Sequence, residues 1–251
     1  MENNQFEMQN KSVQSNDLIR SVWSLDAVSL KIFEMVVSCL DSYPMTKGGN
    51  DTVHISKASI YSMFSASDKD RNFRFKNHLK SLQKQVVSIV DYDTKKITQI
   101  VPFPTVQWGI DDSDDLVMFE INKRILPYLL ELKRNYTTYE IQNIRGLTSK
   151  YAILMYKFVK MNAFKGGSFI VSIEDYRKYS NTLKDYARFA DFEKRVLFDA
   201  KNEINASYGD ILISYEKVRP SRKITHIRFF WRERMPLEET IDYDPFKNIK
   251  I

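Results

Sequence analysis

Hydrophobic and polar positions follow the same order twice along this chain. Each copy begins with a short alternating strand and a short helix, passes through a polar turn into a longer basic helix, and ends in two alternating strands. This is the order of elements in a winged helix, and the two copies agree throughout. The pattern therefore predicts an α+β fold with two tandem winged-helix domains, a fold that in a basic protein indicates sequence-specific binding of duplex DNA. The matching segments are 53–56 and 170–173 (short strand), 57–64 and 174–180 (short helix), and 75–86 and 188–205 (long helix).

The segments around the two copies have simpler patterns. Apolar residues over 18–40 recur at helical spacing, and Ser24 or Asp26 is expected to divide them into two helices. Turn residues, alternation and capping residues predict the other elements. These are a loop over 42–51, hairpin strands over 97–108 and 116–121, a helix from Asn122 to Lys133 that Pro127 bends or restarts, a strand over 136–141, an amphipathic helix capped by Thr148, and a turn at Gly166 and Gly167.

Length and composition agree with two domains. A chain of 251 residues has room for two domains of ordinary size, and 43% hydrophobic residues are enough for two cores. We place the domain boundary near Gly146. The predicted organisation is a flexible N-terminal arm over 1–15, an N-terminal winged helix over 16–145, a C-terminal winged helix over 146–235 and a C-terminal tail over 236–251.

Charge and cysteine content restrict the class of partner. The net charge of +6 and the pI of about 9.1 favour a polyanionic partner, either nucleic acid or an acidic membrane surface. Cys39 is the single cysteine, which excludes a disulfide framework and suits a reducing compartment. The first residues are polar with no signal-peptide pattern, and no apolar run approaches membrane-spanning length. We expect a cytoplasmic protein that does not bind membranes.

The second long helix has two distinct faces. One face is apolar, and the opposite face carries groups that can bind base edges in the major groove: arginine and lysine donate to guanine, and asparagine pairs with adenine. Phe198 lies in the middle of this polar face and is expected to contact either a thymine methyl or another domain, whereas Glu193 is expected to pair with a neighbouring cation. The predicted base-contacting residues are Arg188, Lys194, Arg195 and Asn202, and Lys201 is a predicted backbone contact.

The two hairpins are expected to differ in charge at their tips. The second tip is basic, and between 217 and 234 only Glu233 is acidic, as a wing that holds phosphates requires. The first tip is acidic and should point away from DNA, or its domain should contribute less to binding. The predicted phosphate contacts are Lys217, Arg219, Arg222 and Lys223 in the second wing and Arg71, Arg74, Lys76 and Lys80 in the first long helix; the acidic tip holds Asp111, Asp112, Asp114 and Asp115.

The C-terminal hundred residues resemble a known family, the iteron-binding replication initiators (Rep proteins) of theta-replicating bacterial plasmids. The resemblance covers most of this part of the chain, and the N-terminal half matches in layout with weaker motifs. The matching stretches are 147–156, 186–197, 202–205 and 225–229, with weaker matches at 16–19 and 119–121.

The resemblance implies two winged helices that straddle repeated origin sequences, called iterons, on one face of the duplex. It also implies monomers that initiate replication, dimers that repress the initiator's own gene and form through the N-terminal domain, and recruitment of a host helicase and primase. Base contacts in the family fall here on Arg188 and Lys194, with Arg195 adjacent. Glu193 and Phe198 depart from the residues that relatives often carry, so the resemblance does not define the recognised DNA sequence.

Two other functions compete with the initiator. A rolling-circle initiator would nick DNA with a tyrosine and a metal held by a His-hydrophobic-His pair, but His54, His78 and His226 are far apart in the sequence, and no phosphate-binding Gly-rich loop is present. We therefore expect no catalytic site, metal or cofactor. A transcriptional repressor with the same fold remains an alternative, because its DNA chemistry would be identical.

Overall fold

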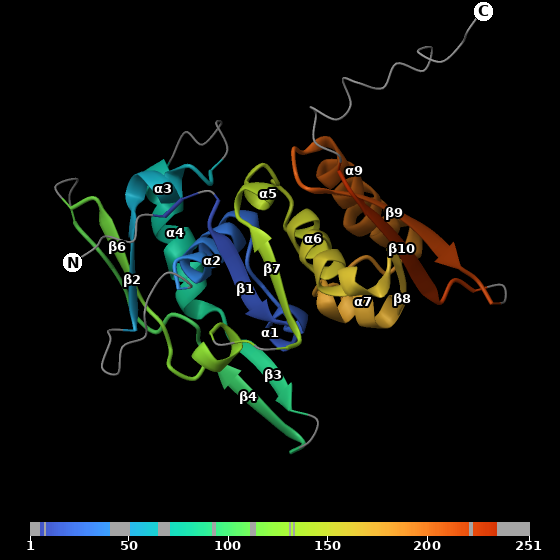
Figure 1. The fold of residues 1–251 in the computed structure, drawn as a ribbon, viewed down its shortest axis with the longest axis horizontal. Coiled ribbons are helices and arrows are strands. Elements are labelled where there is room, and N and C mark those ends of the chain that lie inside the picture. The colour runs from blue at the N-terminus through green and yellow to red at the C-terminus, as the bar shows by residue number, and fades with distance from the viewer. Residues whose placement is uncertain are drawn as a thin grey trace, which may run out of the picture.

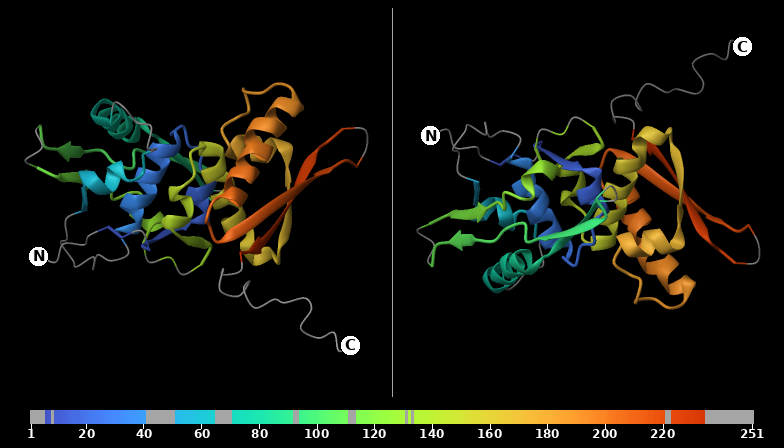
Figure 2. Two further views of the ribbon diagram at one scale, coloured as in Figure 1. Left: turned by 90° about the horizontal axis from the view of Figure 1, so that it is seen from above. Right: turned by 90° about the horizontal axis from the view of Figure 1, so that it is seen from below.

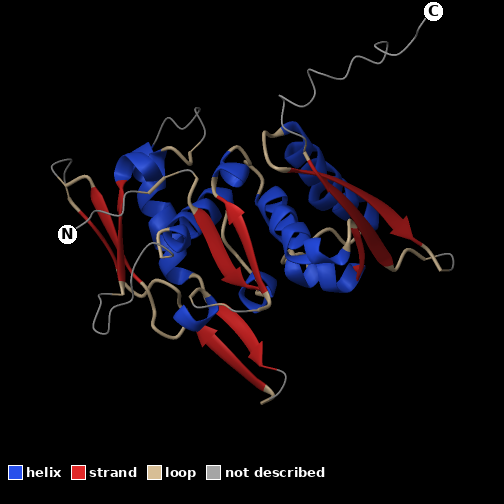
Figure 3. Cartoon of the chain, viewed as in Figure 1, coloured by secondary structure: helices blue, strands red, loops and turns tan. Residues whose placement is uncertain are grey.

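The computed structural model describes residues 6–234 except 8, 41–50, 65–70, 92–93, 111–113, 131, 133 and 221–222. Figure 1 shows two halves side by side, with the long helix α6 (Lys150–Asn162) between them. Figure 3 shows that each half combines helices with small antiparallel sheets. Buried apolar residues form one continuous core through both halves.

The first half contains a winged helix with additional elements around it. β2 leads directly into α3, whose first turn is capped by the Ser56 hydroxyl, and α4 follows. The three-stranded sheet has the order β2-β6-β5, while β3 and β4 form a separate hairpin and β1 pairs with β7. The elements are β1 (Lys11–Ser15), α1 (Asn16–Arg20), α2 (Ala27–Ser38), β2 (Thr52–Ser56), α3 (Lys57–Tyr61), α4 (Arg71–Lys84), β3 (Val87–Asp91), β4 (Lys96–Ile100), β5 (Val106–Trp108), β6 (Leu116–Glu120), the 3-10 helix η1 (Leu126–Tyr128), β7 (Tyr136–Glu140) and α5 (Gln142–Arg145).

The second half repeats the winged-helix order. β8 leads directly into α7, which Ser172 caps by accepting from the Asp175 amide, as Ser56 accepts from the Ser59 amide in α3. The sheet has the order β8-β10-β9. The repeat predicted from the sequence is therefore confirmed. After α6 the elements are the 3-10 helix η2 (Ala163–Lys165), β8 (Ser168–Ser172), α7 (Ile173–Tyr179), α8 (Phe189–Phe192), a π-helical stretch (Glu193–Phe198), α9 (Asp199–Ala206), β9 (Ile211–Val218) and β10 (His226–Glu233).

Several local predictions are also confirmed. Asp26 divides the apolar segment over 18–40 and caps α2, because its carboxylate accepts from the Ser29 amide at 2.7 Å. Gly166 and Gly167 turn the chain into β8 with φ of 73° and 85°, a backbone conformation that glycine adopts without a Cβ clash. The predicted loop over 42–51 and the tail over 236–251 lie, apart from Asp51, outside the described residues.

Part of the segment predicted to be a flexible N-terminal arm, over 1–15, is a strand. Residues 11–15 form β1, which pairs with β7 in antiparallel register from Lys11 opposite Glu140 to Ser15 opposite Tyr136. The side chains of Ser12 and Gln14 are fully buried. The polar sequence concealed this strand because its buried positions are polar and bind a buried charge, described below.

Two further predictions in the first half were wrong. The segment over 97–108 is not one strand: β4 ends at Ile100 and pairs with β3, and β5 pairs with β6, because Pro102 and Pro104 interrupt the pairing between them. The helix expected from Asn122 to Lys133 is reduced to η1, in which Pro127 removes a backbone donor.

The cap predicted at Thr148 was misplaced by one residue. Ser149 caps α6 by accepting from the Tyr151 amide at 3.2 Å. The Thr148 hydroxyl instead donates to the Glu203 carboxylate at 2.7 Å, which ties the start of α6 to α9.

A buried ion pair joins the two halves. Lys157 of α6 and Glu34 of α2 both have fully buried side chains, and Nζ lies 2.5 Å from Oε1. The other oxygen of Glu34 accepts from the hydroxyls of Ser12 and Tyr139, each at 2.6 Å, and also from the Gln14 amide. Since every partner is buried and hydrogen-bonded, this polar cluster holds β1, α2, β7 and α6 in one arrangement.

The cap of α2 gives the fold a stability contribution that depends on pH. Burial raises the pKa of the Asp26 carboxyl, but hydrogen bonds from His78 and from the Ser29 amide outweigh burial and lower this pKa to about 2, against an ordinary value of 3.8. A lowered folded-state pKa stabilises the protein above the ordinary value, and this stabilisation is lost as the pH falls through the folded value. Asp26→Asn keeps a capping oxygen without the charge. We expect the difference in unfolding free energy between wild type and Asp26→Asn to shrink between pH 5 and pH 2; a constant difference contradicts the assignment.

Candidate nucleic-acid interface

The second long helix runs without interruption from α8 through the π-helical stretch into α9. Its apolar stripe is buried as predicted, with Phe192, Val196, Leu197, Ala200 and Ile204 each at most 1% exposed. Phe189, at the start of the stripe, is half-buried. The π-helical stretch spans Glu193 to Phe198, in the middle of the face predicted to bind DNA.

The predicted base-contacting residues lie together on the open face of this helix. Arg188, Lys194, Arg195 and Asn202 are all exposed. Asn205 lies on the same helix but is used internally, because its side chain exchanges two 2.8 Å hydrogen bonds with the backbone of Ile213 in β9.

An arginine that the sequence reasoning missed positions the start of this helix. Arg177 of α7 donates to the carbonyl oxygens of Thr182, Asp185 and Tyr186 at 2.8–3.1 Å, and its guanidinium lies 4.2 Å from the centre of the Phe192 ring. These hydrogen bonds hold the loop that leads to Arg188. No sequence motif marks Arg177, since its partners are backbone carbonyls.

Glu193 pairs with a cation, as predicted, and the cation is Lys217 of β9 at 2.9 Å. Burial and the neighbouring Glu193 carboxylate raise the pKa of the Tyr215 hydroxyl to about 12. The ion pair between Glu193 and Lys217 connects the long helix to the wing. The phosphate contact predicted for Lys217 stays a prediction and competes with this pair.

Phe198 remains accessible on the same face. Its side chain is 47% exposed, and the Lys201 ammonium lies 5.0 Å from the centre of its ring. The ring borders a groove of about 550 Å³ between the long helix and β9. Lys201 is half-buried beside this ring, and a thymine contact by Phe198 stays a prediction.

β9 and β10 form the predicted wing, a hairpin of two eight-residue strands. Arg219 and Lys223 are exposed near its tip, and Arg222 lies outside the described residues. Arg234, at the base of the wing, serves the fold, because its guanidinium donates to the carbonyls of Gly209 and Asn205 at the end of α9.

The first long helix, α4, carries its own exposed cations. Arg74, Lys76 and Lys80 are exposed, and Arg71 begins the helix with a side chain outside the described part. In the β5–β6 hairpin, Asp114 accepts from the Leu116 amide at 3.0 Å, and Asp111 and Asp112 lie outside the described residues.

The two long helices lie on the same side of the molecule. Figure 2 shows α4 and the α8–α9 helix on one side in both views, with the β5–β6 hairpin and the β9–β10 wing extending from opposite ends. One straight ligand could therefore contact both helices. Such an arrangement suits a duplex presenting successive major grooves on one face.

Two of the three histidines, His78 and His226, have structural partners. His78 lies 3.1 Å from Asp26 and 3.2 Å from the Ser29 hydroxyl, and His226 makes the predicted local hydrogen bond, at 2.8 Å to the Thr225 hydroxyl. Among the described residues, no group of histidine, cysteine and acidic side chains is arranged to hold a metal ion. None of the described helices is long and apolar enough to span a membrane.

Fold and exposed basic helix faces define a tandem winged-helix protein. The chain belongs to the replication initiator family: the family model described as "Initiator Replication protein, WH1" matches residues 11–160, and the model described as "Initiator Rep protein, WH2" matches residues 172–231. The first match includes α6, which the sequence-based boundary near Gly146 places in the second domain; that boundary stays a prediction.

The solved structure of an initiator protein supports the fold. The chain is similar to the Pi initiator protein, whose structure is described as a complex with iteron DNA, with a TM-score of 0.73 and 17% identity over 90% of this chain and 98% of that one. A second similar structure contains domains 2 and 3 of RctB, with a TM-score of 0.49 and 8% identity over 89% of this chain and 86% of that one.

Proposed function

We propose that this chain is a plasmid replication initiator that binds iterons as duplex DNA and has no catalytic activity of its own. The observation that carries the proposal is the placement of two basic helices on one side of the molecule, with Arg188, Lys194, Arg195 and Asn202 exposed on the second. Membership in the initiator family supports it, as does the similarity in fold to the Pi initiator protein, which was solved in complex with iteron DNA.

Under this proposal the two halves make different kinds of contact with DNA. The second winged helix reads bases and its wing holds phosphates, while α4 supplies further phosphate contacts. We further propose that the chain associates with itself through the N-terminal half, represses its own gene and recruits a host helicase and primase. We propose that it does so in the cytoplasm.

Replication in trans tests the initiator role. A plasmid that carries the DNA upstream of this gene but lacks the gene should replicate only when the chain is supplied from a second, compatible plasmid. Lys194→Ala should abolish or strongly reduce its copy number, whereas Arg134→Ala, an exposed arginine outside the proposed interface, should not. Specific DNA binding without any replication in trans would instead favour a transcriptional repressor.

The wing predicts a salt effect. Arg219→Ala and Lys223→Ala should each weaken binding to any duplex and reduce the slope of log Kobs against log salt by about 1, because each removes one phosphate contact. Arg134→Ala serves as the control, with an unchanged slope expected. An unchanged slope in the two wing variants would remove the wing from the interface.

A further inference from the structure

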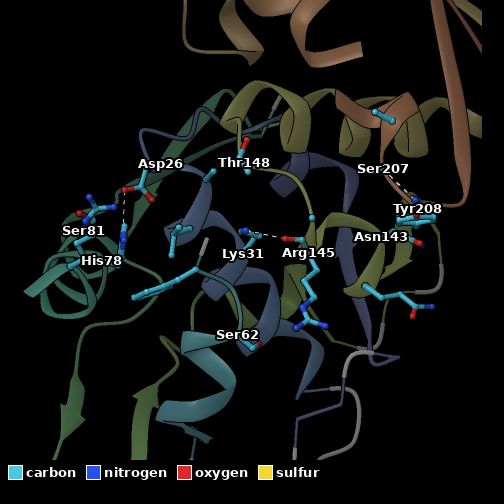
Figure 4. A pocket seen from close by; sticks show the side chains of 18 of the residues that line it. Asp26, Lys31, Ser62, His78, Ser81, Asn143, Arg145, Thr148, Ser207 and Tyr208 are labelled. Carbon is cyan, nitrogen blue, oxygen red and sulfur yellow. Dashed lines mark hydrogen bonds and ion pairs between the residues drawn. The ribbon is translucent and has the colours of Figure 1, made fainter. Parts of the chain in front are cut away.

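A groove lined by both polar and apolar side chains separates the two long helices. It has a volume of about 940 Å³ and lies between α4 on one side and the C-terminal end of α9 on the other, with the start of α2 and the short helix α5 along its length. Figure 4 shows Lys31 and Arg145 in the middle of this groove, Asp26 and His78 on one side, and Ser207 and Tyr208 on the other. Neither half forms this groove alone.

The groove favours an anion. Lys31, Arg74 and Arg145 contribute to its lining, and Asp26 is the one carboxylate among the described lining residues. That carboxylate is already engaged by His78 at 3.1 Å and by the Ser29 amide. Arg145 brings an exposed cation to the groove, and hydroxyl and amide groups make up most of the polar part of its lining.

Two of the exposed side chains in the groove, those of Arg145 and Tyr208, have groups that can bind a phosphate. Arg145 ends α5 and is exposed, and its carbonyl accepts from Lys31 Nζ at 3.0 Å, so the backbone from which its guanidinium extends is held in place. Tyr208 follows α9 and is 97% exposed, a large aromatic side chain with its hydroxyl open to solvent. A planar guanidinium binds a phosphate through two parallel hydrogen bonds, and a tyrosine hydroxyl donates one.

The geometry of duplex DNA identifies the anion. Successive major grooves on one face lie about 34–36 Å apart, and a minor groove flanked by phosphates faces the protein midway between them. If α4 and α9 occupy two such grooves, the sugar–phosphate backbone beside the intervening minor groove passes the space between these helices. This space is the groove between α4 and α9.

We propose that the groove between α4 and α9 is a third DNA-contacting site, in which Arg145 and Tyr208 bind the sugar–phosphate backbone midway between the two major-groove contacts. The inference rests on the proposed function, because it requires both helices to engage one duplex. It assigns DNA binding to the junction of the two halves as well as to each winged helix.

Phosphate ethylation interference tests the site. The probe is a duplex recovered by selecting random-sequence DNA with the wild-type full-length chain. With wild type, ethylation at phosphates midway between the two helix-contacted regions should block binding. Arg145→Gln should remove this interference, leave interference at the outer phosphates unchanged, weaken binding several-fold and lower the salt slope by about 1. Tyr208→Phe should reduce the central interference without changing the salt slope.

A control variant accompanies the experiment, and the results that contradict the inference differ from the result that contradicts the proposed function. Arg134→Gln, which replaces an exposed arginine outside the groove, should leave the pattern and the slope unchanged, and circular dichroism confirms that each variant folds. Recovery of a specific duplex without central interference, or central interference that survives Arg145→Gln, would overturn this inference and leave the proposed function standing. Failure to select any duplex would overturn the proposed function itself.

Discussion

Replacing Lys157 by methionine should lower the free energy of unfolding by about 3–5 kcal/mol, the cost of removing one partner from a buried ion pair. Methionine has a similar shape, so the loss comes from the charge. Glu34 would keep its hydroxyl and amide donors but would lose the cation that balances it in a fully buried position. Denaturant unfolding followed by circular dichroism measures the effect.

Lys160→Met provides the matched control on the same helix. Lys160 pairs with Asp210 at 2.8 Å, but its side chain is 21% exposed and that of Asp210 is 37% exposed. Partly solvated pairs contribute about 0.2–1 kcal/mol, so this variant should lose little. Equal, small losses in the two variants would show that the buried cluster does not hold the halves together. In the double variant Glu34→Gln/Lys157→Met, part of the lost stability should return, because no uncompensated charge stays buried.

The second large effect concerns base recognition. Arg188→Ala or Lys194→Ala should each cost about 1–3 kcal/mol of binding to specific DNA if it removes a base contact. Discrimination between specific and random duplex should shrink by the same factor. Competition binding with both kinds of duplex at one fixed salt concentration measures this directly.

Lys201→Ala is the comparison on the same helix. Lys201 is half-buried beside Phe198 and is predicted to contact phosphate, so its loss should weaken specific and random duplex about equally. If Arg188→Ala and Lys194→Ala behave in the same way, these residues touch only phosphate and base readout must come from elsewhere on the helix.

Periodicity predicted the elements that carry DNA-binding groups. The stripe from Phe192 to Ile204 fixed which face of the second helix is buried, and the exposed positions of Arg188 and Lys194 follow from it. The serine caps of α3 and α7 are local, so the short helices could be placed as well. These features depend on residues that are close together in the sequence, so a single sequence is enough to predict them.

Features that depend on distant partners escaped prediction. The bond between Lys157 and Glu34 joins residues 123 positions apart, and the polar residues of β1 suggested an arm because their partner charge lies elsewhere. Arg177 binds backbone carbonyl oxygens, and because every residue has one, the sequence does not identify its partners. The groove around Arg145 needs both halves in place, so neither winged-helix pattern could reveal it.

The measurement that tests the central claim most directly is a hydroxyl-radical footprint of the purified chain on the DNA upstream of its own gene, with random duplex as competitor. We predict protection of direct repeats, each over about two helical turns and on one face of the duplex, as two helices in successive major grooves require. The absence of protection above competitor would contradict this claim, leaving a basic protein whose two winged helices do not bind specific DNA together.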